Sequence, residues 1–206
     1  MTRIALFASG NGTNAENLIR HLTKGQAVVL LCNNPQAPVL ERARKLGIPA
    51  EVFTAEQLQN PKAEPSVLSI LRSYDVELLV LAGFLWKIPK HLLQAYPGRI
   101  LNIHPALLPA FGGKGMYGMH VHRAVLDHLR NRPASASTPP YGVSGITIHL
   151  IDNHYDRGQM LFQATCPVER NDTPESLAQK VHALEYKYFP HVVDHYIDTA
   201  LTRNKL

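Results

Sequence analysis

The sequence is poor in cysteine, with only Cys32 and Cys166 among 206 residues. Neither belongs to a CxxC pair, which argues against a disulfide framework and favours a reducing compartment. Long hydrophobic runs are also missing, since Leu78 to Trp86 falls well below the roughly 18 residues that a membrane helix needs. The apolar stretch after Arg3 is too short for a signal peptide. We therefore expect a cytoplasmic protein without a membrane partner.

The chain has no dense run of basic residues, although 21 Lys and Arg outnumber 16 Asp and Glu and give a net charge of +5. The basic residues are scattered, with small groups at 42–45 and 130–132. This distribution mildly favours anionic ligands and predicts no nucleic-acid partner. With 45% hydrophobic and 18% charged residues, the composition is that of a globular domain.

The first half of the sequence alternates between apolar runs and segments of helical periodicity. The runs are typical of strands buried on both faces of a sheet, and the segments between them place their apolar residues on one side of a helix. Such alternation predicts an α/β fold with a Rossmann-like, mostly parallel twisted sheet and helices on both faces. The expected strands are Ile4–Ala8, Ala27–Cys32, Ala50–Phe53, Leu78–Ala82 and a run from Ile100; the expected helices include Val39–Leu46, Pro65–Tyr74 and Pro89–Ala95.

The second half predicts two further strands, at 145–151 and 160–166, of which the second runs back along the first. A last helix should begin with Pro174 at its first position, continue to about Ala200, and kink or break at Pro190. We expect one domain over residues 1–206, with a phosphate-binding half at 1–100 and a catalytic and ligand-binding half at 101–206.

A glycine-rich turn, Ser9 to Asn14, follows the first strand and precedes a helix. This arrangement gathers backbone N–H groups at a helix N-terminus, which is a site for anions. It lacks the third glycine of the dinucleotide fingerprint and the lysine of a P-loop. The alternative is a plain turn in which Thr13 or Asn14 caps the helix.

Two polar residues, Asn102 and His104, interrupt the apolar strand that starts at Ile100. Side chains two apart on a strand point to the same face, and ligands bind at the carboxyl ends of strands in open α/β sheets. The pair could instead satisfy local backbone groups. Residues 83–88 form an apolar turn after the preceding strand, which either walls a flat aromatic ligand or packs against the next helix.

Two histidine pairs have spacings compatible with a metal ion, namely His120 with His122 and His191 with His195. No further ligands follow at a suitable spacing. We expect no metal, and a solvated helix face for the second pair.

Taken together, these motifs resemble the phosphoribosylglycinamide formyltransferase family of folate-dependent enzymes. The resemblance covers nearly the whole chain and follows one order of motifs: Gly10–Asn14, Leu81–Phe84, Asn102–Pro109, Ile148–Ile151 with Tyr155–Gly158, and Ala183–Glu185.

The resemblance implies formyl transfer from 10-formyltetrahydrofolate, as co-substrate, to the amine of glycinamide ribotide in purine biosynthesis. It implies small-molecule partners only, no metal, and a monomer or homodimer. The implied catalytic residues are Asn102, His104 and Asp156, the last raising the pKa of His104, with His149 behind them. The implied ribotide contacts are Gly12, Thr13, Asn14 and Glu185, and the implied folate contacts are Leu85, Trp86, Lys87, Ile88 and Asn102.

The chemistry fits these residue types independently. An amine that attacks a formyl carbon forms a tetrahedral oxyanion, which an amide and an imidazolium can stabilise. The leaving folate nitrogen needs a proton, which a histidine can relay.

The sequence departs from the family pattern at Gly112–Gly118 and Asn131–Tyr141, which are longer than in most relatives, and Lys62 and Lys87 are the candidates for the acidic folate tail. Other readings are a formyltetrahydrofolate hydrolase, a methionyl-tRNA or sugar-nucleotide formyltransferase, or a non-catalytic phosphate- or nucleotide-binding module.

Overall fold

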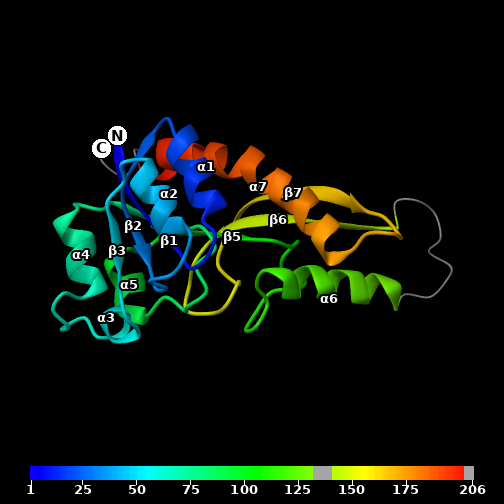
Figure 1. The fold of residues 1–206 in the computed structure, drawn as a ribbon, viewed down its shortest axis with the longest axis horizontal. Helices are drawn as coiled ribbons and strands as arrows, with labels where there is room; N and C mark the ends of the chain where they lie inside the picture. The colour runs from blue at the N-terminus through cyan, green and yellow to red at the C-terminus, as the bar shows by residue number, and fades with distance from the viewer. Residues whose placement is uncertain (132–140, 202–206) are drawn as a thin grey trace. The chain divides into compact units, whose positions relative to one another are not determined.

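The computed structural model describes residues 1–131 and 141–201. Seven strands form one mixed sheet in the order β3-β2-β1-β4-β5-β6-β7, which confirms the predicted α/β class (Figure 1). The chain divides into two compact units, one of residues 1–102 with the chain from Pro190 onward, and one of residues 103–189. Apart from its two end residues, the expected extension Asn131–Tyr141 lies outside the described residues.

The first unit contains the parallel part of the sheet, β3-β2-β1-β4-β5. Its register sets Phe7 opposite Leu81, and Leu81 opposite Asn102. The carboxyl ends of β1, β4 and β5 are therefore level, so the connections that leave them emerge at one edge. These strands are β1 (Thr2–Ala8), β2 (Gly25–Cys32), β3 (Ala50–Val52), β4 (Leu78–Leu81) and β5 (Ile100–His104).

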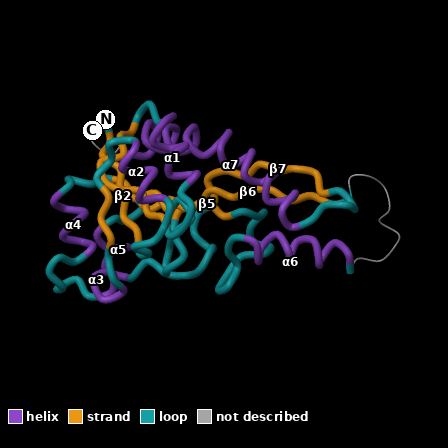
Figure 2. Tube along the Cα trace, in the orientation of Figure 1, coloured by secondary structure: helices purple, strands orange, loops and turns teal. Residues whose placement is uncertain are grey.

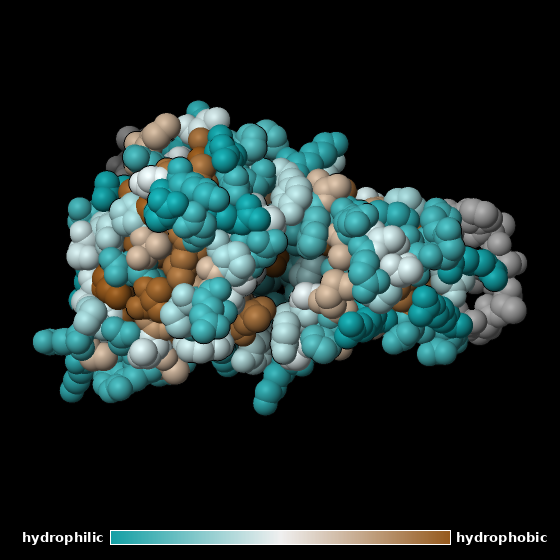
Figure 3. Space-filling view, in the orientation of Figure 1, coloured by the Kyte–Doolittle hydropathy of each residue, from teal (hydrophilic) through white to brown (hydrophobic). Residues whose placement is uncertain are grey.

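The helices of the first unit connect these strands. The chain steps outward from β1 to β3 and then returns to β4 and β5, so right-handed crossovers place the helices before β3 on one face and the later ones on the other. The face of the molecule that Figure 3 shows is mostly hydrophilic, and its apolar surface gathers over the sheet of this unit. The helices are α1 (Thr13–His21), α2 (Val39–Lys45), α3 (Ala55–Gln59), α4 (Val67–Ser73) and α5 (Lys90–Ala95).

Two local details of the first unit differ from the sequence-based expectations. The cap of α1 is Gly12, in the left-handed region with φ of 78°, and not Thr13 or Asn14. Glycine reaches this φ without strain, so the turn closes without a side-chain cap. Residues 54–64, a polar stretch for which the sequence predicted no helix, contain α3, which Thr54 and Gln57 start with a reciprocal capping box.

The second unit is a β-hairpin with two helices, drawn in Figure 2. Strands β6 (Gly142–Leu150) and β7 (Met160–Val168) are antiparallel and confirm the two predicted strands; β6 begins three residues earlier and ends one residue earlier than expected, and β7 ends two residues later. Phe162 on β7 packs against Tyr188 on α7, with the ring centroids 5.0 Å apart. The helices are α6 (Met119–Arg130) and α7 (Pro174–Tyr196).

Of the kink or break expected at Pro190, the break does not occur, because α7 runs through this residue to Tyr196 and a π-helical turn, Ile197–Leu201, follows. Phe189 and Val193, on either side of the proline, are fully buried. Farther along, the Asp194 carboxylate accepts bonds from Thr23 N and Oγ1, each 2.8 Å long, and from Lys24 N at 2.9 Å.

Candidate active site

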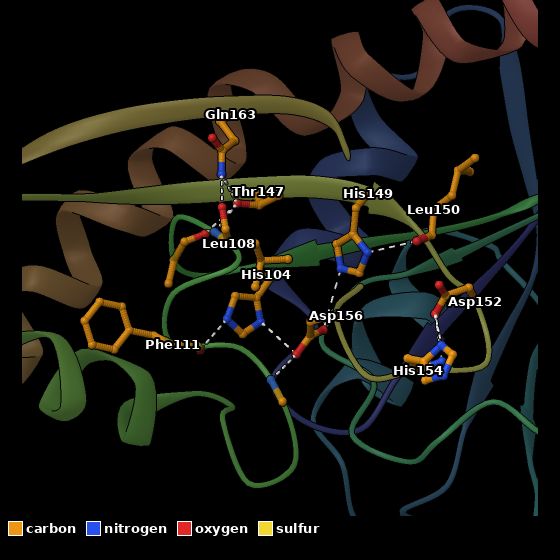
Figure 4. Close-up of polar contacts among 12 residues, drawn as sticks. His104, Leu108, Phe111, Thr147, His149, Leu150, Asp152, His154, Asp156 and Gln163 are labelled. Carbon is orange, nitrogen blue, oxygen red and sulfur yellow. Dashed lines mark hydrogen bonds and ion pairs between the residues drawn. The ribbon is translucent and has the colours of Figure 1, made fainter. Parts of the chain in front are cut away.

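His104 ends β5 and is almost fully buried, with 3% of its surface exposed. Its Nε2 lies 2.8 Å from the carbonyl oxygen of Phe111 (Figure 4). Because a carbonyl oxygen can only accept, Nε2 carries the hydrogen. Nδ1 lies 3.8 Å from Asp156 Oδ2. The neutral ring therefore turns a lone pair toward the carboxylate, and a second proton would convert the contact into an ion pair.

Asp156 stands between two imidazole rings. His149 Nε2 lies 3.6 Å from its other oxygen, Oδ1. His149 Nδ1 donates to the carbonyl of Leu150 at 2.9 Å, so His149 also turns its second nitrogen toward the acid. Gly113 N donates to Asp156 Oδ2 at 2.8 Å. The structure thus brings the expected acid beside His104, although 52 positions separate them in the sequence.

Burial dominates the protonation of both histidines. It lowers the pKa of His104 below the ordinary value, against the opposing effects of the Asp156 charge and the Phe111 hydrogen bond. Burial likewise lowers the pKa of His149. The expected upward pull of Asp156 on the pKa of His104 is present, but desolvation outweighs it. A ring that is neutral at pH 7 is ready to accept a proton.

A buried hydroxyl fixes the segment that follows His104. Thr147 Oγ1 donates to Ala106 O at 2.7 Å and accepts from Leu108 N at 3.0 Å. Gln163 Nε2 adds bonds to the same hydroxyl at 2.8 Å and to Leu108 O at 3.0 Å. Sequence reasoning missed these two side chains. The available signal was the alternation of the strand at 145–151, which places Thr147 on the same face as His149.

Glycines allow the chain to close around Asp156. A Cβ on Gly112 would lie 2.5 Å from Leu108 Cδ2 and 3.2 Å from Asp156 Cβ. A Cβ on Gly158 would lie 1.8 Å from the Leu150 carbonyl oxygen. The second approach is to backbone, so the turn at Gly158 requires glycine, whereas a side chain at position 112 would need the Leu108 side chain to move.

In the first unit, the glycine-rich turn lies beside the apolar turn after β4. Ser9 N donates to Gly83 O, and Leu85 N donates to Ser9 Oγ, both at 3.1 Å. Gly12 caps α1, whose first two residues are Thr13 and Asn14. The backbone N–H groups of this helix start thus face the carboxyl edge of the sheet.

The apolar turn after β4 has a buried side and an exposed side. Phe84 and Ile88 are buried, whereas Leu85 and Trp86 are 51% and 37% exposed. The Trp86 ring meets the edges of Phe53 and Phe84, at centroid distances of 6.1 and 6.5 Å. One side of the turn therefore packs into the core and the other presents a supported aromatic surface.

Asn102, Glu185 and Lys87, the remaining predicted site residues, differ in exposure. Asn102 is half-buried on β5, one pleat before His104 and on the same face of the strand. Glu185 is 5% exposed on α7, and Lys87 is exposed in the apolar turn.

The histidine pair on α6 does not converge on a common ligand, because His122 is buried and His120 exposed. Among the residues that the structure describes, no group of three or more histidine, cysteine or acidic side chains is arranged to hold a metal. No helix in the described ranges is long and apolar enough to cross a membrane.

The model of the formyl transferase family matches residues 2–193. Phosphoribosylglycinamide formyltransferase of Bacillus subtilis is 37% identical over 94% of this chain and 93% of its own length. The chloroplastic enzyme of Arabidopsis thaliana is 43% identical over 93% of this chain, which spans 64% of that longer protein. The crystal structure of the Bacillus halodurans enzyme superposes with a TM-score of 0.79 at 33% identity, covering 97% of each chain. The chain therefore belongs to the formyl transferase family, in its phosphoribosylglycinamide formyltransferase branch.

Proposed function

We propose that this chain transfers the formyl group of 10-formyltetrahydrofolate to the amine of N1-(5-phosphoribosyl)glycinamide. The products are formylglycinamide ribotide and tetrahydrofolate, in the de novo pathway to IMP. The observation that carries the proposal is the buried His104, with Nε2–H bonded to a carbonyl oxygen and Nδ1 turned to Asp156. This arrangement lets one ring donate to an oxyanion and store a proton.

In the proposed reaction the amine attacks the formyl carbon, and the formyl oxygen becomes an oxyanion. Asn102 and the Nε2–H of His104 donate to it, the oxyanion replacing the Phe111 carbonyl as the acceptor. The amine loses a proton as the new C–N bond forms, and the folate nitrogen takes one as the old bond breaks. His104 relays this proton, which Asp156 stabilises at Nδ1.

The ribotide phosphate is assigned to the N–H groups at the start of α1, from Gly12, Thr13 and Asn14, because a helix N-terminus attracts anions. Glu185 is assigned to the ribotide and the Leu85–Ile88 turn to the pterin. The exposed faces of Leu85 and Trp86 suit a flat ring system. The phosphate-binding and catalytic halves, at 1–100 and 101–206, follow this assignment.

Family membership favours transfer over the non-catalytic binding module. The formyl folate is a co-substrate, and we propose no metal, only small-molecule partners, and a cytoplasmic monomer or homodimer.

The test mixes the purified protein with both substrates and follows free tetrahydrofolate and formylated ribotide. The proposal predicts that both form in equal amounts and only when ribotide is present. Tetrahydrofolate released without ribotide would identify a hydrolase instead. Retained ribotide binding without turnover would identify a binding module.

A further inference from the structure

Arg42 on α2 forms hydrogen bonds to the glycine-rich turn. Arg42 Nε donates to the backbone oxygen of Asn11 at 2.8 Å, and Nη2 donates to Asn11 Oδ1 at 2.9 Å. The planar guanidinium presents these donors as a fork, so the two bonds fix both the position and the rotation of Asn11. Asn11 immediately precedes Gly12, the cap of α1.

The same helix holds the residues on either side of Asn11. Val39 N donates to Gly10 O at 3.2 Å. A Cβ on Gly12 would lie 2.1 Å from Val39 Cγ2, so the turn runs directly against the start of α2. Three consecutive residues of the turn, 10 to 12, are therefore set by contacts with α2.

Arg42 also controls the charge near the start of α1. Its Nη1 bonds the carboxylate of Glu16, which stands in the first turn of α1 and also accepts a 2.9 Å bond from Arg20. Arg42 foremost, and then Arg20, hold the pKa of Glu16 below its usual value, so this carboxylate stays ionised. An uncompensated carboxylate here would repel a phosphate at the helix N-terminus.

We propose that Arg42 is a positioning residue for the phosphate of the substrate, which it does not itself touch. It orients Asn11, and through it the N–H groups that follow, and it compensates the charge of Glu16. The inference rests on the proposed function for the identity of the phosphate ligand.

The test compares Arg42→Ala and Arg42→Lys with Arg44→Ala as the matched control. Arg44 is on the same helix and pairs with Glu41, three residues before it, through two 2.7 Å bonds. We expect Arg42→Ala to raise KM for glycinamide ribotide about tenfold, equivalent to one charge-assisted hydrogen bond, with kcat within about twofold. Arg42→Lys, which keeps the charge and loses the fork, should recover part of the loss, and Arg44→Ala should match the wild type.

Two further arms separate positioning from a general structural effect. With glycinamide riboside, which lacks the phosphate, Arg42→Ala should behave as the wild type. Adding Glu16→Gln to Arg42→Ala should recover part of the affinity for the ribotide. An unchanged KM in Arg42→Ala, or an equal loss for ribotide and riboside, would overturn the inference.

The failure of this inference can be told apart from the failure of the proposed function. If the wild type does not formylate the ribotide, the proposed function fails, and calorimetry with inorganic phosphate still decides the role of Arg42. Weaker phosphate binding by Arg42→Ala and Arg42→Lys than by Arg44→Ala would support it. Equal binding by all three variants would refute it.

Discussion

Replacing Thr147 by valine tests how the segment after His104 is held. The two side chains have nearly the same shape, so the change removes a hydroxyl and leaves the packing in place. That hydroxyl donates to Ala106 O and accepts from Leu108 N and Gln163 Nε2, in a part of the molecule where Thr147 is fully buried. The substitution therefore leaves the buried Ala106 carbonyl and the buried Leu108 N–H without the hydrogen bonds that the hydroxyl makes.

The magnitude follows from these two groups. Each unsatisfied buried backbone group costs about 1–3 kcal/mol, whereas the Gln163 amide keeps its bond to Leu108 O. We expect a loss of about 3 kcal/mol in the free energy of unfolding, which for a chain of this size lowers Tm by roughly 6–12 °C. Since the segment begins at His104, kcat should fall as well.

Urea denaturation and steady-state kinetics measure both effects. Thr147→Ser, which keeps the hydroxyl, should lose no more than about 1.5 kcal/mol. Thr165→Val, on the exposed face of the neighbouring strand, should stay within about 0.5 kcal/mol of the wild type. A Thr147→Val protein as stable as the wild type would refute the reasoning.

Three other substitutions extend these predictions. Burial lowers the pKa of His122 to about 4, so the unfolded state takes up a proton first as the pH falls below 6.5. The free energy of unfolding should then drop by about 3 kcal/mol by pH 4. In His122→Leu, the free energy measured by urea unfolding at each pH should fall less steeply between pH 6.5 and pH 4; an equally steep fall would contradict this. Asp156→Asn removes an upward pull on the pKa of His104, so kcat should fall about 100-fold or more with ribotide affinity kept; near-normal turnover would exclude the assigned role. Asp194→Ala removes the acceptor of three hydrogen bonds and should cost about 2–3 kcal/mol in thermal unfolding without affecting kcat; unchanged stability would show that the contact contributes nothing.

The parallel sheet could be predicted from the sequence because its central strands, β1, β4 and β5, are largely buried on both faces. A run such as Ile4–Ala8 must be apolar throughout, and that requirement is visible without any partner. The pair Asn102 and His104 stands out for the same reason, since polar residues in such a run need an explanation. Local sequence patterns were therefore enough to predict the positions of these strands and of the two catalytic candidates on β5.

What the sequence could not supply were relations between distant segments. The hairpin at 145–166 could be predicted, but no local pattern indicates that the turn between its strands brings Asp156 to the imidazole of His104. Thr147 shows the same limit, because one hydroxyl in an alternating strand does not reveal which backbone it serves. The unbroken helix at Pro190 has a related cause, since the apolar side chains on both sides are buried and local preference alone does not decide the outcome.

The central claim is that the site around His104 moves a formyl group from folate to the ribotide amine. Single-turnover transfer of an isotopically labelled formyl group tests it most directly, in the wild type and in His104→Ala. We predict that the wild type places the label on the ribotide and that His104→Ala does so at least about 100-fold more slowly, with ribotide binding retained. Label released as formate, or equal transfer by the two proteins, would contradict the claim.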